Sequence, residues 1–136
     1  ETVQTSMNEA SQKGEVLFVD QRQLVTFGQI TDIPFVTEYE KKVMMNKALE
    51  ENQSYFEGYY QDLKAKRFSL IIIDPLNITI QGNGNIFNKE NNAWVLWVAV
   101  PTACYYEVKF TASKFNFELL TPRAEPLKMV GNFVCP

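Results

Sequence analysis

The chain has 136 residues, of which 46% are apolar and 21% are charged, as in ordinary globular proteins. Its formal net charge is −3 and it contains no basic cluster, which excludes nucleic acid as an expected partner. It also contains no histidine, so Ser–His, Cys–His and histidine–metal sites cannot be built from this sequence.

A capping-box pattern opens the chain, with Ser6 at the predicted N-cap and Glu9 three residues later. It predicts a short helix that Gly14 can end in a left-handed conformation. Residues 15–19 (EVLFV) then predict a strand, because a short apolar run bounded by turn residues is typical of a buried strand.

Asp20 lies directly after this strand and, with Gln23, predicts the start of a short helix over residues 21–27. Residues 33–36 predict a further short strand. Pro34 confines that strand to a strand start or to an edge of the sheet, because proline cannot donate a hydrogen bond to a neighbouring strand.

Two helices should follow, each opened by another capping box. The first begins at Thr37 and extends over residues 37–51, and the second begins at Ser54. Four residues of the second helix recur at i, i+3, i+4 and i+7, so they form an apolar stripe that should face a sheet. These residues are Phe56, Tyr59, Tyr60 and Leu63.

Residues 68–73 (FSLIII) predict the central strand, which Asp74 and Pro75 end. The three basic residues within 64–67 favour the C-terminal end of the preceding helix electrostatically. Residues 15–20 share the design of the central strand, an apolar run followed by aspartate. Because strands buried on both faces belong mostly to parallel sheets covered by helices, the two strands predict a parallel core.

The second half of the chain predicts a loop, a helix and two strands. Residues 74–87 contain two glycines among asparagines and predict an exposed loop. Residues 89–100 favour a helix, although the alternation of apolar residues in this segment also suits a strand. Residues 105–111 and 117–121 predict two strands paired antiparallel, and the tail over 122–136 is expected to be irregular.

This order of elements predicts an α/β fold, a three-layer sandwich with a mostly parallel, Rossmann-like sheet and an antiparallel edge hairpin. We expect residues 1–136 to form a single domain. The chain starts with Glu1 rather than Met and shows no signal-peptide pattern, so we expect it to be part of a longer protein.

The C-terminal ends of parallel strands are where open α/β folds place ligands. The first strand offers Asp20, Gln21 and Arg22 there, and the central strand offers Asp74 and Asn77. If these strands are neighbours, the two aspartates would face one crevice and could hold Mg²⁺ or the hydroxyl groups of a sugar. The alternative is local, with Asp20 capping a helix and Asp74 in a turn.

No cofactor is expected. The turn after the first strand (DQRQ) lacks glycine, and the pair Gly82 and Gly84 does not fit a phosphate-binding loop, which argues against a nucleotide. The aromatic residues within 55–60 could bind a sugar ring or a protein partner, but at helical spacing they also suit a core.

The two cysteines, Cys104 and Cys135, are either independent thiols or a disulfide that ties the C-terminal tail to the domain. A disulfide would require an oxidising compartment. It would stabilise the fold by about 3 kcal/mol through loop-closure entropy.

Four segments carry a family resemblance through their order and spacing. Residues 14–28 (GEVLFVDQRQLVTFG) precede an apolar segment that holds Pro34. The next segment is 62–76 (DLKAKRFSLIIIDPL), followed after a predicted helix by 104–107 (CYYE) and by 119–123 (LLTPR). Together they resemble the extracytoplasmic C-terminal domain of polytopic membrane glycosyltransferases related to the dolichyl-phosphate-mannose protein mannosyltransferases. The residues that match in the second segment are Asp62, Lys64, Arg67, Phe68, Leu70 and Ile71.

The resemblance spans roughly residues 10–123 and implies a location and a role. In this family catalysis belongs to the transmembrane part, which uses lipid-linked sugars, so no catalytic residue carries over to this chain. The domain would lie outside the cytoplasm, where a Cys104–Cys135 disulfide is permitted, and would assist acceptor recognition or stability. Its partners would be the remainder of a polytopic membrane protein and a glycan or protein acceptor. Residues 81–92 and the extended tail depart from the family pattern and could mark a subgroup with its own partner.

Two other classes of function stay open at this point. The chain could be an α/β enzyme that binds a metal or a sugar through Asp20 and Asp74, and metal binding lost in Asp20→Asn would favour this class. It could also be a protein-interaction module, which solvent exposure of Tyr55 and Tyr59 would favour.

Overall fold

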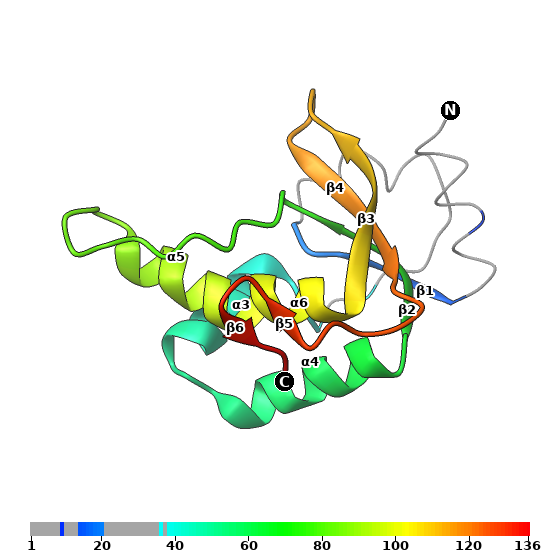
Figure 1. Ribbon diagram of the computed structural model, residues 1–136, viewed down its shortest axis with the longest axis horizontal. Helices are drawn as coiled ribbons and strands as arrows, with labels where there is room; N and C mark the ends of the chain where they lie inside the picture. Colours follow the sequence, from blue (N-terminus) through cyan, green and yellow to red (C-terminus); the bar gives the residue numbers. More distant parts are fainter. Residues whose placement is uncertain (1–8, 10–13, 21–35, 37) are drawn as a thin grey trace.

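The computed structural model describes Glu9, residues 14–20, Val36 and residues 38–136 (Figure 1). The helix expected at the N-terminus, the helix expected over 21–27 and the strand expected over 33–36 fall almost entirely outside these residues.

The described strands form a four-stranded sheet in the order β1-β2-β4-β3. β1 (Glu15–Phe18) pairs in parallel with β2 (Phe68–Ile73). β4 (Phe117–Pro122) lies between β2 and β3 (Tyr106–Ala112) and is antiparallel to both. The β3–β4 hairpin thus supplies half of this sheet.

The expectation of a mostly parallel, Rossmann-like sheet is therefore wrong. Among the described strands, β1 and β2 form the parallel pair and the other pairings are antiparallel. Of the two strands of the expected hairpin, β3 forms the edge of the sheet and is exposed over most of its length. β4 lies inside the sheet, and its residues Phe117, Leu119 and Leu120 are buried. An apolar run predicts burial on both faces, but an antiparallel strand between two neighbours satisfies the same pattern.

The central strand has the environment that its sequence predicts. Leu70 and Ile72 belong to one buried cluster, and Ile71 and Ile73 belong to the other. Alternate residues of β2 therefore pack on opposite faces of the sheet, as the geometry of a strand requires.

The described helices pack on one face of the sheet (Figure 1). They are α3 (Lys41–Leu49), α4 (Gln53–Lys64) and a long helix made of α5 (Asn88–Trp94), the π-helical η1 (Val95–Ala99) and α6 (Val100–Tyr105). Phe56, Tyr59 and Leu63 of the expected stripe are buried in this core, and Tyr60 packs at its margin.

Both helix starts differ from the predicted capping boxes. α3 begins at Lys41, after Glu40, whose side chain makes no capping bond. α4 begins after Asn52, which accepts a hydrogen bond from the Tyr55 backbone N–H at 3.0 Å. Asparagine caps a helix as well as serine does, so the earlier residue starts the helix and Ser54 lies inside it.

The segment that suited either a helix or a strand is helical, and the helix continues past Pro101 to Tyr105. Proline has no N–H, so the carbonyl one turn earlier, that of Trp97, loses its usual partner. The Tyr60 hydroxyl donates to this carbonyl at 2.7 Å. The tyrosine hydroxyl thus replaces the missing donor at a carbonyl that belongs to the π-helical turn.

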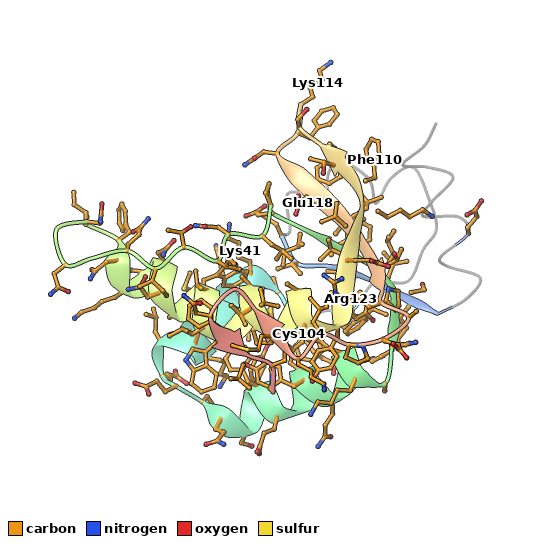
Figure 2. The ribbon with its side chains drawn as sticks, viewed as in Figure 1. Lys41, Cys104, Phe110, Lys114, Glu118 and Arg123 are labelled. Carbon is orange, nitrogen blue, oxygen red and sulfur yellow. A yellow bond between two sulfur atoms is a disulfide. The ribbon has the colours of Figure 1, made fainter. Side chains whose placement is uncertain are left out.

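The C-terminal tail is more ordered than expected. β5 (Met129–Val130) and β6 (Phe133–Val134) form a two-stranded ribbon. A disulfide joins Cys135 to Cys104, which lies among the helices in Figure 2. The Tyr105 hydroxyl also donates to the Pro136 carbonyl, so the end of the described chain is held against α6.

Candidate functional site

The structure brings the two strand-end aspartates to one place. Asp20 follows β1 and Asp74 follows β2, and these strands are parallel neighbours. Both carboxylates face the ammonium group of Lys41, the first residue of α3. Lys41 Nζ lies 2.5 Å from Asp74 Oδ2 and 3.9 Å from Asp20 Oδ2. The geometric part of the sequence argument therefore matches the structure.

Lys41 changes the chemistry of this site. Its backbone N–H donates to the Val19 carbonyl at 2.6 Å, which fixes the start of α3 against the end of β1. Its side chain then supplies a positive charge between the two carboxylates. A bound cation would have to displace this ammonium, so the arrangement suits an ion-paired structural cluster better than a Mg²⁺ site.

Sequence analysis missed both Lys41 and Glu118. Glu118 of β4 accepts a hydrogen bond from the Leu76 backbone N–H at 3.1 Å and so orders the chain after Asp74. Nothing in its sequence neighbourhood indicates this contact, which depends on β4 pairing with β2. Lys41 also carried no signal in the sequence, because the predicted helix begins at Thr37, whereas the observed start at Lys41 places its ammonium group at the positive end of the helix dipole beside the carboxylates.

The other predicted site residues do not join this cluster. Gln21 and Arg22 lie outside the described residues. Asn77 is exposed, and its side chain donates to Asn91 at 3.3 Å and accepts from the Thr79 backbone N–H at 2.9 Å. It belongs to the polar contacts between the loop after β2 and α5.

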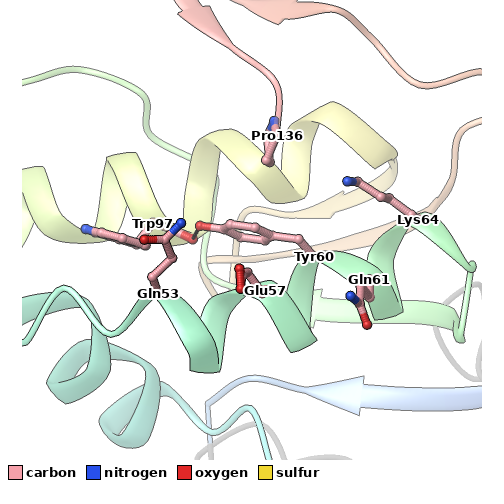
Figure 3. Close-up of a pocket in the computed structure, with 7 residues that line it drawn as sticks. All are labelled: Gln53, Glu57, Tyr60, Gln61, Lys64, Trp97 and Pro136. Carbon is pink, nitrogen blue, oxygen red and sulfur yellow. Dashed lines mark hydrogen bonds between the residues drawn. The ribbon is translucent and has the colours of Figure 1, made fainter.

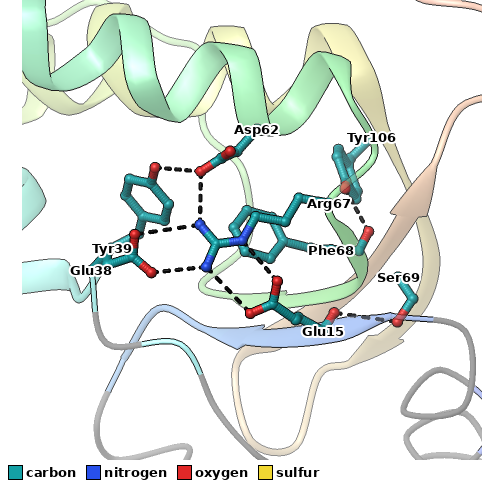
Figure 4. A network of polar contacts seen from close by, with 8 residues as sticks. All are labelled: Glu15, Glu38, Tyr39, Asp62, Arg67, Phe68, Ser69 and Tyr106. Carbon is teal, nitrogen blue, oxygen red and sulfur yellow. Dashed lines mark hydrogen bonds and ion pairs between the residues drawn. The ribbon is translucent and has the colours of Figure 1, made fainter.

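A second polar cluster surrounds Arg67 at the opposite end of β1 and β2 (Figure 4). The guanidinium contacts Glu15 Oε2 at 2.9 Å, Glu38 Oε1 at 2.8 Å and Asp62 Oδ2 at 2.8 Å. Asp62 also accepts from the Tyr39 hydroxyl at 2.6 Å. One arginine thus links β1, α4 and the segment before α3, rather than acting mainly on the end of α4 as expected.

These contacts shift the acid–base properties of the groups involved. The hydrogen bond from Arg67 lowers the pKa of Glu15, and the bonds to Glu15 and Glu38 raise the pKa of Arg67 above its usual value. Burial, followed by the bond to Asp62, raises the pKa of Tyr39. The groups are held in the protonation states they have at neutral pH, which suits a structural role.

A cavity of about 350 Å³ lies between α4, η1 and the end of the tail (Figure 3). Tyr60 and Trp97 give it an aromatic wall, and the other side chains offer amide, carboxylate and ammonium groups. Its lining residues are Gln53, Glu57, Tyr60, Gln61, Lys64, Trp97 and Pro136. Its size is at the lower end for small-molecule sites, and its mixed lining suits a small polar molecule with one apolar face, such as a single sugar ring.

The aromatic residues of α4 do not form an exposed patch. Tyr59 is fully buried and its hydroxyl pairs with that of Thr102 at 2.7 Å. Tyr55 is half-buried and donates to the Glu38 carbonyl at 2.7 Å, and burial raises the pKa of Tyr55 to about 12. The exposure that would favour a protein-interaction module through these tyrosines is not present.

The described residues contain no group of three or more His, Cys, Asp or Glu side chains placed to hold a metal ion. No helix within the described ranges is long and apolar enough to cross a membrane. Comparison of the chain with protein-family models, with curated proteins and with solved structures finds no match.

Proposed function

We propose that this chain is a non-catalytic, extracytoplasmic domain of a membrane glycosyltransferase that uses lipid-linked sugar donors, where it assists acceptor recognition or stability. The observation that carries the proposal is the Cys104–Cys135 disulfide. Disulfides persist in oxidising compartments and are rare in the cytosol, so the bond supports an extracytoplasmic location. The glycosyltransferase assignment rests on the sequence resemblance.

The positions of the matching residues support a structural meaning for the resemblance. Phe68, Leu70 and Ile71 are buried in β2. Asp62 and Arg67 form the centre of the polar cluster in Figure 4. The matching segment therefore holds the sheet to α4, as expected for a domain that shares a fold, rather than a catalytic site, with its relatives.

The strand-end aspartates support the non-catalytic part of the proposal. The ammonium group of Lys41 lies 2.5 Å from Asp74 Oδ2, so it occupies the position from which a metal ion would contact this oxygen. Asp20 is buried beside the same ammonium. Two carboxylates that share one ammonium in this way favour a folding role over metal-dependent chemistry.

The experiment uses the natural full-length protein in its own cells, with an epitope placed directly after Pro136. Lysates are denatured in the presence of polyethylene-glycol maleimide, which labels free thiols. Cys104 and Cys135 should be labelled only after reduction, measured as a gel shift against a variant with both cysteines replaced by serine. Protease added outside spheroplasts should remove the epitope. The sequence upstream of Glu1 should encode many membrane spans.

Two results would overturn the proposal. Labelling of both thiols without reduction, together with an epitope protected from external protease, would place the domain in the cytosol. A soluble domain directly upstream of Glu1 in the gene would remove the membrane parent.

A further inference from the structure

The loop after β2 and the start of α5 form a projecting structure that we name the arm, residues 76–92. Figure 1 shows it extending from the body of the protein at the left. Side-chain amides hold its two sides together. Asn92 donates to the Gln81 carbonyl at 2.9 Å and accepts from the Gln81 N–H at 2.8 Å, and Asn91 donates to the Thr79 carbonyl at 2.8 Å. The reciprocal Asn92 contacts imitate a strand pairing and stiffen the arm.

The tip of the arm, residues 82–87, presents two adjacent apolar side chains to solvent. Ile86 is 88% exposed and Phe87 is 69% exposed. They are two of the three most exposed large apolar side chains among the described residues, the other being Val134 at 76%. Isolated exposed apolar residues need no explanation, but a neighbouring pair on a stiff projection indicates a contact surface.

The tip segment around this pair carries no charge, and the two charged residues that follow it, Lys89 and Glu90, have opposite signs. The sequence contains no Asp, Glu, Lys or Arg from Pro75 to Asn88, although 21% of the chain is charged. The remainder of the tip consists of glycine and asparagine. The pair therefore has a neutral, hydrogen-bonding collar.

We propose that the tip of the arm inserts Ile86 and Phe87 into the interface of a zwitterionic lipid bilayer. Two side chains on a convex tip cover far less than the roughly 800 Å² per partner that a stable protein interface buries, which disfavours a second copy or a protein partner. A lipid interface accepts small apolar groups without a complementary pocket. The neutral amide collar matches headgroups without net charge, whereas the net charge of −3 opposes an anionic surface.

Insertion of two side chains gives weak, reversible binding, so the arm acts as a second contact for a domain already held at the membrane. In this respect the inference rests on the proposed location beside a membrane parent. A tether raises the effective concentration of the tip at the bilayer, so weak contact orients the domain instead of recruiting it.

The test uses the 136-residue chain held on vesicles through an N-terminal histidine tag, a flexible linker and a nickel-chelating lipid. The vesicles are phosphatidylcholine, with or without bromine on the acyl chains. Phe87→Trp places a fluorophore at the tip, and Phe115→Trp is the matched control. Phe115 is 59% exposed in the turn of the β3–β4 hairpin, beside Lys114, which Figure 2 shows at its outer end.

Brominated lipid should quench the added fluorescence of Phe87→Trp at least three-fold more than that of Phe115→Trp. Combining Ile86→Ser with Phe87→Trp should reduce the quenching of the tip tryptophan by brominated lipid. Replacing a fifth of the lipid with phosphatidylglycerol should leave the Phe87→Trp quenching unchanged or lower it. Equal quenching of the two tryptophans, or tip contact only with anionic lipid, would overturn the inference.

This test and the cell experiment fail separately. The artificial tether makes the vesicle measurement independent of where the natural protein lies, so a cytosolic location in cells would leave the lipid result standing. Conversely, a tip without lipid contact would leave the extracytoplasmic location intact. All three substitutions are at exposed positions, and an unchanged near-ultraviolet circular dichroism spectrum shows that the variants are folded.

Discussion

Replacing Lys41 with Met tests whether the ammonium group holds the ends of β1 and β2 together. Methionine keeps most of the length and the apolar stem of lysine, so the change mainly removes the charge. Asp20 and Asp74 would then face each other without the cation that lies 3.9 Å and 2.5 Å from their Oδ2 atoms. We expect Lys41→Met to lower the free energy of unfolding.

The exposure of the three side chains sets the expected magnitude. They are 38% exposed for Lys41, 30% for Asp74 and 11% for Asp20. A hydrogen bond to a charged group contributes about 1.5–3 kcal/mol, whereas a solvent-exposed ion pair contributes about 0–1 kcal/mol. This cluster lies between the two cases, so the expected loss is about 1–2 kcal/mol.

The assay is urea unfolding at pH 7, followed by the fluorescence of Trp94 and Trp97. Lys42→Met is the control, since Lys42 is exposed on the same turn of α3 and should change stability by less than about 0.5 kcal/mol. Adding Asp74→Asn to Lys41→Met should recover part of the loss, because it removes the repulsion between carboxylates. Equal stability of the Lys41 and Lys42 variants would refute the reasoning.

Titration of the unmodified chain with Mg²⁺ or Ca²⁺ bears on the same cluster. Calorimetry should detect no binding, since the Lys41 ammonium already occupies the position beside the two carboxylates that a metal ion would take. Binding that disappears in Asp20→Asn would instead favour a metal-dependent enzyme.

Two further predictions concern other polar contacts. Tyr59→Phe and Thr102→Val each remove one partner of a fully buried hydroxyl pair, so each should lower the free energy of unfolding by about 1–3 kcal/mol. The double variant should lose less stability than the sum of the two single losses. Additive losses in urea unfolding would show that the hydroxyls are not coupled. The bond from Arg67 lowers the pKa of Glu15 below 4.5 in the folded protein, so its contribution is complete above pH 4.5 and decreases as the pH falls through the lower, folded value. Glu15→Gln should therefore flatten the dependence of the urea midpoint on pH below 4.5, and an unchanged acid limb would contradict this assignment.

Local patterns were sufficient for much of the secondary structure. The apolar run of β2 predicted a strand buried on both faces, and the i, i+3, i+4, i+7 spacing in α4 predicted a buried stripe. The turn between β3 and β4 also follows from sequence, because the two apolar segments are separated by few residues. These features depend on residues close together in the chain, so the pattern of apolar residues in the sequence is enough to predict them.

Strand order and direction could not be derived in the same way. Burial on both faces of β2 is satisfied by a parallel neighbour, β1, on one side and by the antiparallel β4 on the other. The sequence records how apolar a strand is, but hydrogen bonding to a distant strand sets its direction. The apolar strand β4 of the hairpin therefore pairs with β2 where the sequence argument expected a parallel neighbour.

The candidate site was also predictable from the sequence only in part. The order of the residues was enough to place Asp20 and Asp74 after two buried strands, and their proximity followed once these strands were neighbours. The group that lies beside both aspartates is the ammonium of Lys41, which tertiary packing brings there from the start of α3. Electrostatic attraction acts through space over a few ångströms, so the role of the two aspartates depended on a residue that sequence order alone did not connect to them.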